Sequence, residues 1–159
     1  MIESKYAFPE SFRAALEDAR RLAEQAGERT VGPDHILLAI LNDPTCPAYR
    51  ILAALGANPT TLKKQLRSKE GSRSTTPRSP TYGRGAMQLV QSAMKEAAAL
   101  SNDHTGTEHL LLSLVRPRPW FGRPLFGSPY WRAGQLLRAA GVLPETIENK
   151  LRTIGGAGA

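Results

Sequence analysis

Residues 32–38 read Gly-Pro-Asp-His-Ile-Leu-Leu, and residues 106–112 read Gly-Thr-Glu-His-Leu-Leu-Leu. The second stretch begins 74 residues after the first. An alanine-rich segment precedes each stretch, and a Leu-Gly or Ala-Gly pair follows it further along. Because an internal repeat determines the architecture before any finer feature does, this doubling predicts two copies of one small helical unit that pack on each other.

The first copy is expected to contain four helices. Within residues 9–26, apolar residues recur at steps of three and four while charged residues fill the other face, which predicts an amphipathic helix. Residues 35–41 are almost wholly apolar, so we expect a short helix that is buried on all sides. Helices over residues 48–55 and 59–66 follow, and Gly56 ends the first of these two.

The second copy repeats this plan, with helices expected over residues 85–100, 107–115, 133–140 and 144–154. After its second helix the offset between the copies rises from 74 to 85 residues, because Gly141 corresponds to Gly56. The second copy therefore carries an insertion of 11 residues between its second and third helices, near residues 116–127.

These patterns predict an all-α domain of two tandem four-helix repeats related by a pseudo-twofold axis. Repeat 1 is expected over residues 8–66 and repeat 2 over residues 85–154. Residues 67–84 are rich in Ser, Thr, Pro, Gly and Arg and are expected to form the linker. The glycine-rich residues 155–159 are expected to form a disordered tail.

The composition favours a cytoplasmic protein. The chain has 159 residues and one cysteine, Cys46, so it forms neither an intramolecular disulfide nor a cysteine-based metal cluster. It has no run of about 18 apolar residues and no apolar signal sequence at its start. The net charge of +7 indicates affinity for acidic partners, and a basic nucleic-acid-binding protein is the alternative function.

The doubled motif resembles the N-terminal, double-repeat domain of the Clp AAA+ unfoldases, and the ClpC branch is the most similar. The segment Tyr-Gly-Arg-Gly-Ala-Met at residues 82–87, before a helix rich in Ala, Lys and Glu, is also similar to that branch. The resemblance covers residues 8–154. The sequence contains no Gly-x-x-x-x-Gly-Lys-Ser/Thr phosphate loop, so we expect a natural stand-alone protein without ATPase modules.

This resemblance implies a non-catalytic protein-recognition module of a Clp protease or chaperone system. The implied partners are client proteins, adaptors or Clp subunits, with no cofactor and no membrane. The residues themselves show no catalytic constellation, because neither a Gly-x-Ser-x-Gly elbow nor a His-x-x-x-His pair is present.

The repeated motif has the residue types of a recognition site. The motif glycine is expected to allow a sharp turn, Thr107 to cap the following helix, and Glu108 to bind a guanidinium beside an anion-binding helix start. Similarity to ClpC-type domains implies that Thr107 and Glu108 in repeat 2, and Asp34 in repeat 1, bind phosphoarginine. Pro33 lacks a hydroxyl and an N–H, and Asp34 is shorter than Glu, so the site in repeat 1 is expected to be weaker. The alternative is that both motifs are simply favourable helix starts.

The two motif histidines, His35 and His109, each open a buried apolar helix beside a carboxylate. We expect structural histidines that are hydrogen-bonded to the backbone of the preceding loop, and neither metal ligands nor catalytic groups.

Residues 116–132 interleave aromatic residues with arginines. Three interpretations are open: the aromatic side chains cover the apolar face of repeat 2, bind a partner protein, or stack on single-stranded nucleic acid. The candidates for contact with a partner are Trp120, Phe121, Tyr130 and Trp131.

Overall fold

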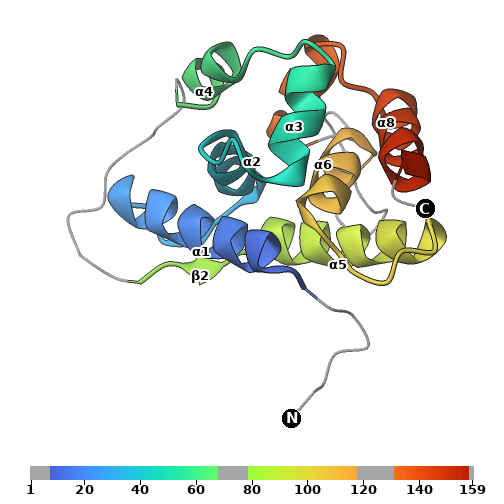
Figure 1. The fold of residues 1–159 in the computed structure, drawn as a ribbon. Coiled ribbons are helices and arrows are strands. Elements are labelled where there is room, and N and C mark those ends of the chain that lie inside the picture. Colours follow the sequence, from blue (N-terminus) through green and yellow to red (C-terminus); the bar gives the residue numbers. More distant parts are fainter. Residues whose placement is uncertain (1–7, 68–78, 118–130, 158–159) are drawn as a thin grey trace.

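The computed structural model describes residues 8–67, 79–117 and 131–157, and Figure 1 shows the fold. These ranges contain eight helices and two short strands, which confirms the expected mostly helical fold. The first four helices are α1 (Glu10–Gln25), α2 (Pro33–Leu41), α3 (Pro47–Ala54) and α4 (Pro59–Arg67). The last four are α5 (Arg84–Ala99), α6 (Thr107–Val115), α7 (Arg132–Ala139) and α8 (Pro144–Ala157). Within these ranges, no helix is both long and apolar enough to span a membrane.

The two repeats pack on each other reciprocally. In Figure 1, the long helices α1 and α5 lie along the lower edge of the molecule, with α2 and α6 above them. Within the repeats, α1 packs against α2 and α5 against α6, whereas across the repeats α3 packs against α6 and α7 against α2. Each third helix therefore covers the second helix of the other repeat, as a pseudo-twofold relation requires.

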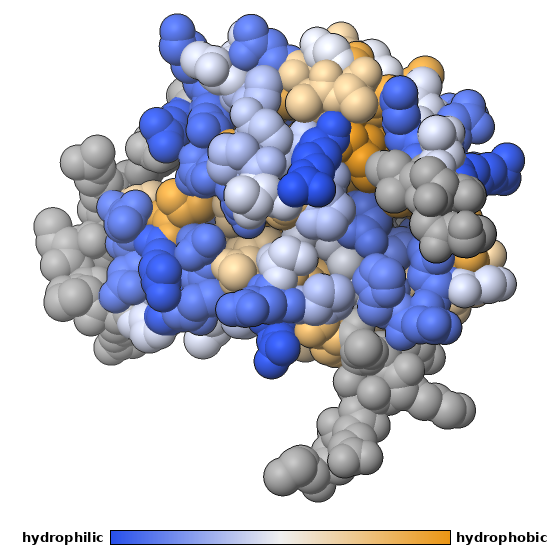
Figure 2. Space-filling view, viewed as in Figure 1, coloured by the Kyte–Doolittle hydropathy of each residue, from blue (hydrophilic) through white to orange (hydrophobic). Residues whose placement is uncertain are grey.

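The second helix of each repeat is buried on nearly every side. All nine residues of α6 and the last seven of α2 are buried, because neither sequence has a polar face. This confirms the buried helix expected over residues 35–41. Both helices belong to one hydrophobic core to which helices of both repeats contribute. The outer surface in Figure 2 is mainly hydrophilic, and its hydrophobic side chains form small separate patches.

Four helices end in the same backbone turn, at the offsets of 74 and 85 residues that relate the repeats. Gly27 after α1 and Ser101 after α5 have φ angles of 72° and 56°, and Gly56 after α3 and Gly141 after α7 have φ angles of 77° and 87°. After each of them, an amide donates a hydrogen bond of 2.9 or 3.0 Å to a carbonyl five residues earlier: Glu28 to Ala23, Asn102 to Ala97, Ala57 to Leu52 and Val142 to Leu137.

A short parallel ladder joins the two repeats. Strand β1 (Thr30–Val31) pairs with strand β2 (Thr81–Tyr82), residue for residue. The hydroxyl of Tyr82 also donates a hydrogen bond of 2.9 Å to the carbonyl of Leu16 in α1. The sequence does not predict this ladder, because β2 lies in the segment 67–84 assigned to the linker and a strand of two residues has no readable alternation.

The chain ends and irregular segments are described only in part. Helix α8 continues to Ala157 and so includes the first three residues of the segment 155–159, which the sequence assigns to a disordered tail. Residues 68–78 of the expected linker and residues 118–127 of the expected insertion lie outside the described ranges. The boundaries of the two repeats therefore stay predictions.

We predict that Ser101→Gly stabilises the protein. Ser101 holds a left-handed conformation that costs a residue with a side chain about 1 kcal/mol, whereas the equivalent Gly27 adopts it without strain. The substitution should raise the free energy of unfolding in urea by about 0.5–1 kcal/mol. The reverse exchange, Gly27→Ser, should lower it by a similar amount. A decrease in stability of the Ser101→Gly variant would contradict this assignment.

Candidate functional site

Two cavities occupy corresponding places in the repeats. Pocket one, of about 460 Å³, is lined among others by Ala26, Glu28, Asp34, Leu66, Arg67 and Arg132. Pocket two, of about 480 Å³, is lined at the corresponding positions by Leu100, Asn102, Glu108, Leu151, Arg152 and Pro47. Each pocket therefore lies where the first turn of a second helix meets the fourth helix of its own repeat and the start of the third helix of the other repeat.

Pocket two contains a buried carboxylate. Glu108, the second residue of α6, is only 7% exposed. Its Oε1 lies 3.3 Å from Nε2 of His104 and 3.6 Å from Nδ1 of His109. Its Oε2 is buried and has no hydrogen-bond partner among the described residues. Because leaving such an oxygen unpaired costs about 1–3 kcal/mol or more, this carboxylate is suited to accept hydrogen bonds from a bound cation.

Gly106 makes room for the carboxylate of Glu108. A Cβ atom at position 106 would lie 2.7 Å from Cδ of Glu108, so any other residue would displace this side chain. The backbone of Gly106 is extended, with φ −108° and ψ −178°, which every residue adopts. The expectation that the glycine serves a sharp turn is therefore wrong, since its role is to leave space for Glu108.

Thr107 has a different role from the expected one. It is the first residue of α6, is fully buried and does not line pocket two. Its Oγ1 accepts a hydrogen bond of 3.2 Å from the N–H of Ala48, in the first turn of α3. The expectation that Thr107 caps its own helix is wrong, because a residue inside the first turn cannot take the N-cap position. Its hydroxyl instead accepts a hydrogen bond from a free backbone N–H at the start of the third helix of the other repeat.

The histidines have the structural role expected of them. Nδ1 of His35 accepts the N–H of Gly32 at 3.0 Å, and Nδ1 of His109 accepts the N–H of Gly106 at 2.9 Å. Nε2 of His35 therefore carries the ring proton and faces Glu28 at 3.4 Å. Nε2 of His109 lies 2.7 Å from the side-chain amide nitrogen of Asn102, and a proton on this Nε2 requires the amide of Asn102 to turn its oxygen toward the ring. In the part of the chain that the structure describes, no group of three or more His, Cys, Asp or Glu residues is arranged to hold a metal.

His109 is held in its neutral form. Its burial lowers the pKa of the ring below the ordinary value, and the charge of Glu108 opposes this effect while His104 adds to it. The neutral ring is also the form that can accept the Gly106 N–H at Nδ1. The hydrogen bond and the burial therefore favour the same protonation state.

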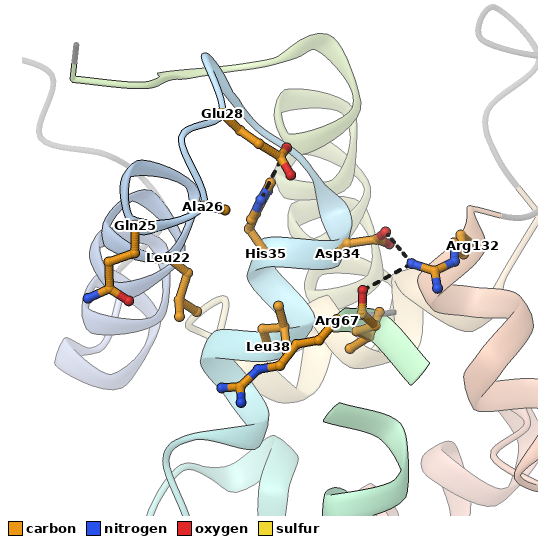
Figure 3. Close-up of a pocket in the computed structure, with 10 residues that line it drawn as sticks. Leu22, Gln25, Ala26, Glu28, Asp34, His35, Leu38, Arg67 and Arg132 are labelled. Atoms are coloured by element: carbon orange, nitrogen blue, oxygen red, sulfur yellow. Dashed lines mark hydrogen bonds and ion pairs between the residues drawn. The ribbon is translucent and has the colours of Figure 1, made fainter. Parts of the chain in front are cut away.

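Pocket one differs from pocket two at its carboxylate. Oδ2 of Asp34 lies 3.4 Å from Nη1 of Arg132, the first residue of α7, and Figure 3 shows the two side chains pointing toward each other. The same Nη1 donates a hydrogen bond of 3.2 Å to the carbonyl of Leu66 at the end of α4. Asp34 thus pairs with an arginine, whereas among the described residues no arginine or lysine pairs with Glu108.

The aromatic insertion is described only at its end. Trp131 is 8% exposed and belongs to the hydrophobic core, where its Nε1 lies beside the backbone of Gly85. Its burial favours the interpretation that this side chain covers an apolar face, over contact with a partner. The other candidates, Trp120, Phe121 and Tyr130, lie outside the described residues.

An apolar groove that the sequence did not predict lies between α1 and α5. In the described ranges, the large hydrophobic residues that stay exposed are Met87, at 56%, and Tyr82, at 38%. They line a groove of about 380 Å³ together with Leu16, Ala86, Val90 and Gln91. The available signal was Met87 itself, which lies outside the inward-facing positions of its helix.

Comparison with known proteins identifies relatives over most of the chain. The family model of the Clp repeat (R) N-terminal domain matches residues 7–119. The chain is 30% identical to the negative regulator of genetic competence ClpC/MecB of Bacillus subtilis over 109 residues, which are 69% of this chain and 14% of the relative. It is 32% identical to an uncharacterized protein of Mycobacterium tuberculosis over 104 residues, which are 65% of this chain and 40% of the relative. The chain thus spans less than half the length of these relatives.

Solved structures share the fold at low sequence identity. The Hsp104 N-terminal domain from Candida albicans matches with a TM-score of 0.69 and 15% identity, covering 94% of this chain and 91% of that one. The N-domain of ClpV from Vibrio cholerae matches with a TM-score of 0.72 and 17% identity, covering 91% and 82%. A complex of a ClpV N-domain with a VipB peptide matches with a TM-score of 0.67 and 19% identity, covering 91% and 84%.

We predict that acid destabilises the fold through His109. Because its pKa is lower in the folded protein than the ordinary 6.5, the unfolded chain binds more protons once the pH falls below about 6.5. The free energy of unfolding, measured in urea at a series of pH values, should therefore decrease from pH 7 toward pH 5. For this one group the slope is at most about 1.4 kcal/mol per pH unit.

Two variants separate His109 from the other titrating groups. His109→Gln should be less stable at pH 7, because the bond to Gly106 is altered, but its stability should depend less on pH in this range. His104→Gln keeps His109 buried, so the stability of this variant should depend on pH nearly as strongly as that of the wild type. Equal slopes for the wild type and His109→Gln would assign the acid sensitivity to another group.

Proposed function

The chain belongs to the family of Clp repeat N-terminal domains, and we propose that it acts as a non-catalytic protein-recognition module of a Clp protease or chaperone system. Its partners in this proposal are client proteins, adaptors or Clp subunits. A ClpV N-domain with the same fold has been solved in complex with a VipB peptide, which supports peptide binding as the mode of recognition.

The buried carboxylate of Glu108, whose Oε2 has no hydrogen-bond partner among the described residues, is the observation that supports this proposal most strongly. A guanidinium matches a carboxylate best, because its N–H groups donate two parallel hydrogen bonds. Arg152 lines the same pocket and is exposed, so it can pair with an anionic group next to that guanidinium. Pocket two therefore suits a side chain that carries a guanidinium and a phosphate together, and we assign it to phosphoarginine on a partner protein.

The remaining walls of pocket two fit the stem of such a side chain. Pro47, Ile51, Leu100 and Leu151 line the pocket and provide apolar surface for the methylene groups of an arginine side chain. The ring of His104, which is about half exposed, contacts Oε1, while Oε2 is buried against Gly106, so in this proposal the carboxylate turns toward the ligand when it binds.

A second contact surface is the groove lined by Leu16, Tyr82 and Met87. We assign it to an apolar peptide segment of the partner protein, because an exposed methionine beside an exposed aromatic ring is typical of adaptable protein-binding surfaces. In this assignment the groove binds the main chain and the apolar side chains of the partner protein. Pocket two binds its phosphoarginine side chain.

We predict that Glu108→Gln weakens the binding of phosphoarginine at least about tenfold, equivalent to 1.4 kcal/mol, in calorimetry with the free amino acid. The substitution keeps the shape of the side chain and removes its charge. Glu10→Gln, in the first turn of α1 and outside both pockets, is the matched control and should bind as the wild type does. Equal affinity of Glu108→Gln and wild type would contradict the assignment of pocket two.

The nucleic-acid alternative is tested by a salt titration. With a net charge of +7, some affinity for DNA or RNA at low salt is expected of any such protein. We predict that this affinity is lost near physiological salt, while binding of a phosphoarginine-containing peptide persists. Nucleic-acid binding that survives physiological salt and exceeds peptide binding would favour the alternative.

A further inference from the structure

The two pockets correspond at six lining positions, and the exchanges at two of these positions change the charged groups. Where pocket two has Pro47 at the start of α3, pocket one has Arg132 at the start of α7. Arg67 and Arg152 are the same residue type at corresponding places, and both pockets have a carboxylate at the second position of a buried helix. Pocket one therefore has a carboxylate and an arginine at the places of Glu108 and Arg152, and in addition the guanidinium of Arg132 and the carboxylate of Glu28, where pocket two has Pro47 and Asn102.

That additional guanidinium lies against the carboxylate. Nη1 of Arg132 is 3.4 Å from Oδ2 of Asp34, and it also donates to the carbonyl of Leu66, while Nη2 donates to the carbonyl of Gln65. Its acceptors thus come from two helices, α2 and α4, so the side chain is held from both sides (Figure 3). The guanidinium beside Asp34 repels a second cation and competes with it for the same carboxylate oxygen.

We propose that Arg132 is a built-in ligand of pocket one. Its guanidinium lies against Asp34, at the position where pocket two has Pro47, and it closes pocket one to guanidinium-bearing partners. The chain then recognises phosphoarginine with pocket two alone, although its backbone offers two equivalent pockets. This inference rests on the proposed function of pocket two.

A ligand cannot easily displace Arg132, because the competition is intramolecular. A side chain on the same chain has a local concentration in the millimolar range or higher at its own acceptor, whereas a ligand acts at its solution concentration. The two carbonyl groups at the end of α4 add to this advantage, since a cation there also faces the negative end of a helix. These contacts keep the guanidinium of Arg132 beside the carboxylate of Asp34.

Removing Arg132 should open the pocket. Arg132→Pro introduces the residue that pocket two has at this position, and the first position of a helix accepts proline. The preceding Trp131 has φ −61° and ψ 156°, a conformation that a residue before proline favours. Asp34→Glu lengthens the carboxylate, and a Cβ built on Gly32 would have only Nδ1 of His35 nearby, at 3.9 Å, so space for the longer side chain exists.

Calorimetry with free phosphoarginine measures the number of binding sites per chain, and so the number of pockets that are open to this ligand. We expect one site per chain for the wild type, none for Glu108→Gln, and two for the Arg132→Pro/Asp34→Glu variant. In the background of Glu108→Gln, the same pair of changes should restore one site. Adding Asp34→Asn in place of Asp34→Glu should abolish that site again, because the carboxylate is then lost.

A purely structural role of Arg132 makes a different prediction. Arg138→Gln is the matched control, since Arg138 is also on α7 and donates a hydrogen bond of 2.9 Å to the carbonyl of Val115, away from Asp34. Both exchanges should lower the stability, but only the Arg132 variants should gain a site. Circular dichroism and urea unfolding confirm that each variant is folded before its sites are counted.

The outcomes separate this inference from the proposed function. If the wild type binds at two sites, or if the Arg132→Pro/Asp34→Glu variant binds no more than the wild type, Arg132 does not close pocket one. If the wild type and Glu108→Gln both fail to bind but the opened pocket one binds, the assignment of pocket two is wrong and that of Arg132 holds. If no variant binds, both are wrong.

Discussion

The mutual cover of α2 and α6 is the constraint on which the structure depends. Each helix is apolar on all sides, and its cover comes in part from the third helix of the other repeat. Burying one Leu or Ile side chain contributes about 2 kcal/mol, so uncovering either helix would cost an amount comparable to the 5–15 kcal/mol stability of a typical domain. Neither repeat can therefore be treated as a domain that folds alone, and the helix starts that line the pockets are held in place by this packing.

A common backbone does not make the two pockets alike. In the second repeat, Glu108 folds back over Gly106, and one of its oxygens has no hydrogen-bond partner in the part of the chain that the structure describes. In the first, Asp34 turns toward Arg132, and its neighbour His35 is paired with Glu28. The backbone turns are the same in both, so the difference in charge and openness comes from side chains at a few corresponding positions. The two pockets thus share a backbone conformation but differ in the side chains that line them.

The helices, their glycine ends and the two buried segments were predictable from the sequence, because each is a local pattern of spacing within one element. The contacts that define the pockets were not. Thr107 and Ala48 are 59 positions apart, and Arg132 and Asp34 are 98 apart. Helical periodicity shows which face of a helix is buried, but it does not say which helix of the other repeat covers it. The motif therefore led to Glu108 as a candidate, whose ligand stays a prediction, but it gave the hydroxyl of Thr107 to the wrong helix and gave no sign that Asp34 has a partner.

The hydrogen bond from Ala48 to Thr107 has a consequence for how such a duplicated protein changes over time. Duplication ordinarily frees one copy to drift while the other retains the ancestral task. Here part of the wall of each pocket comes from the other repeat, and so from the other half of the sequence. A substitution at the start of α3 alters the cavity of the second half, and one at the start of α7 alters that of the first. The two halves are therefore bound to diverge together.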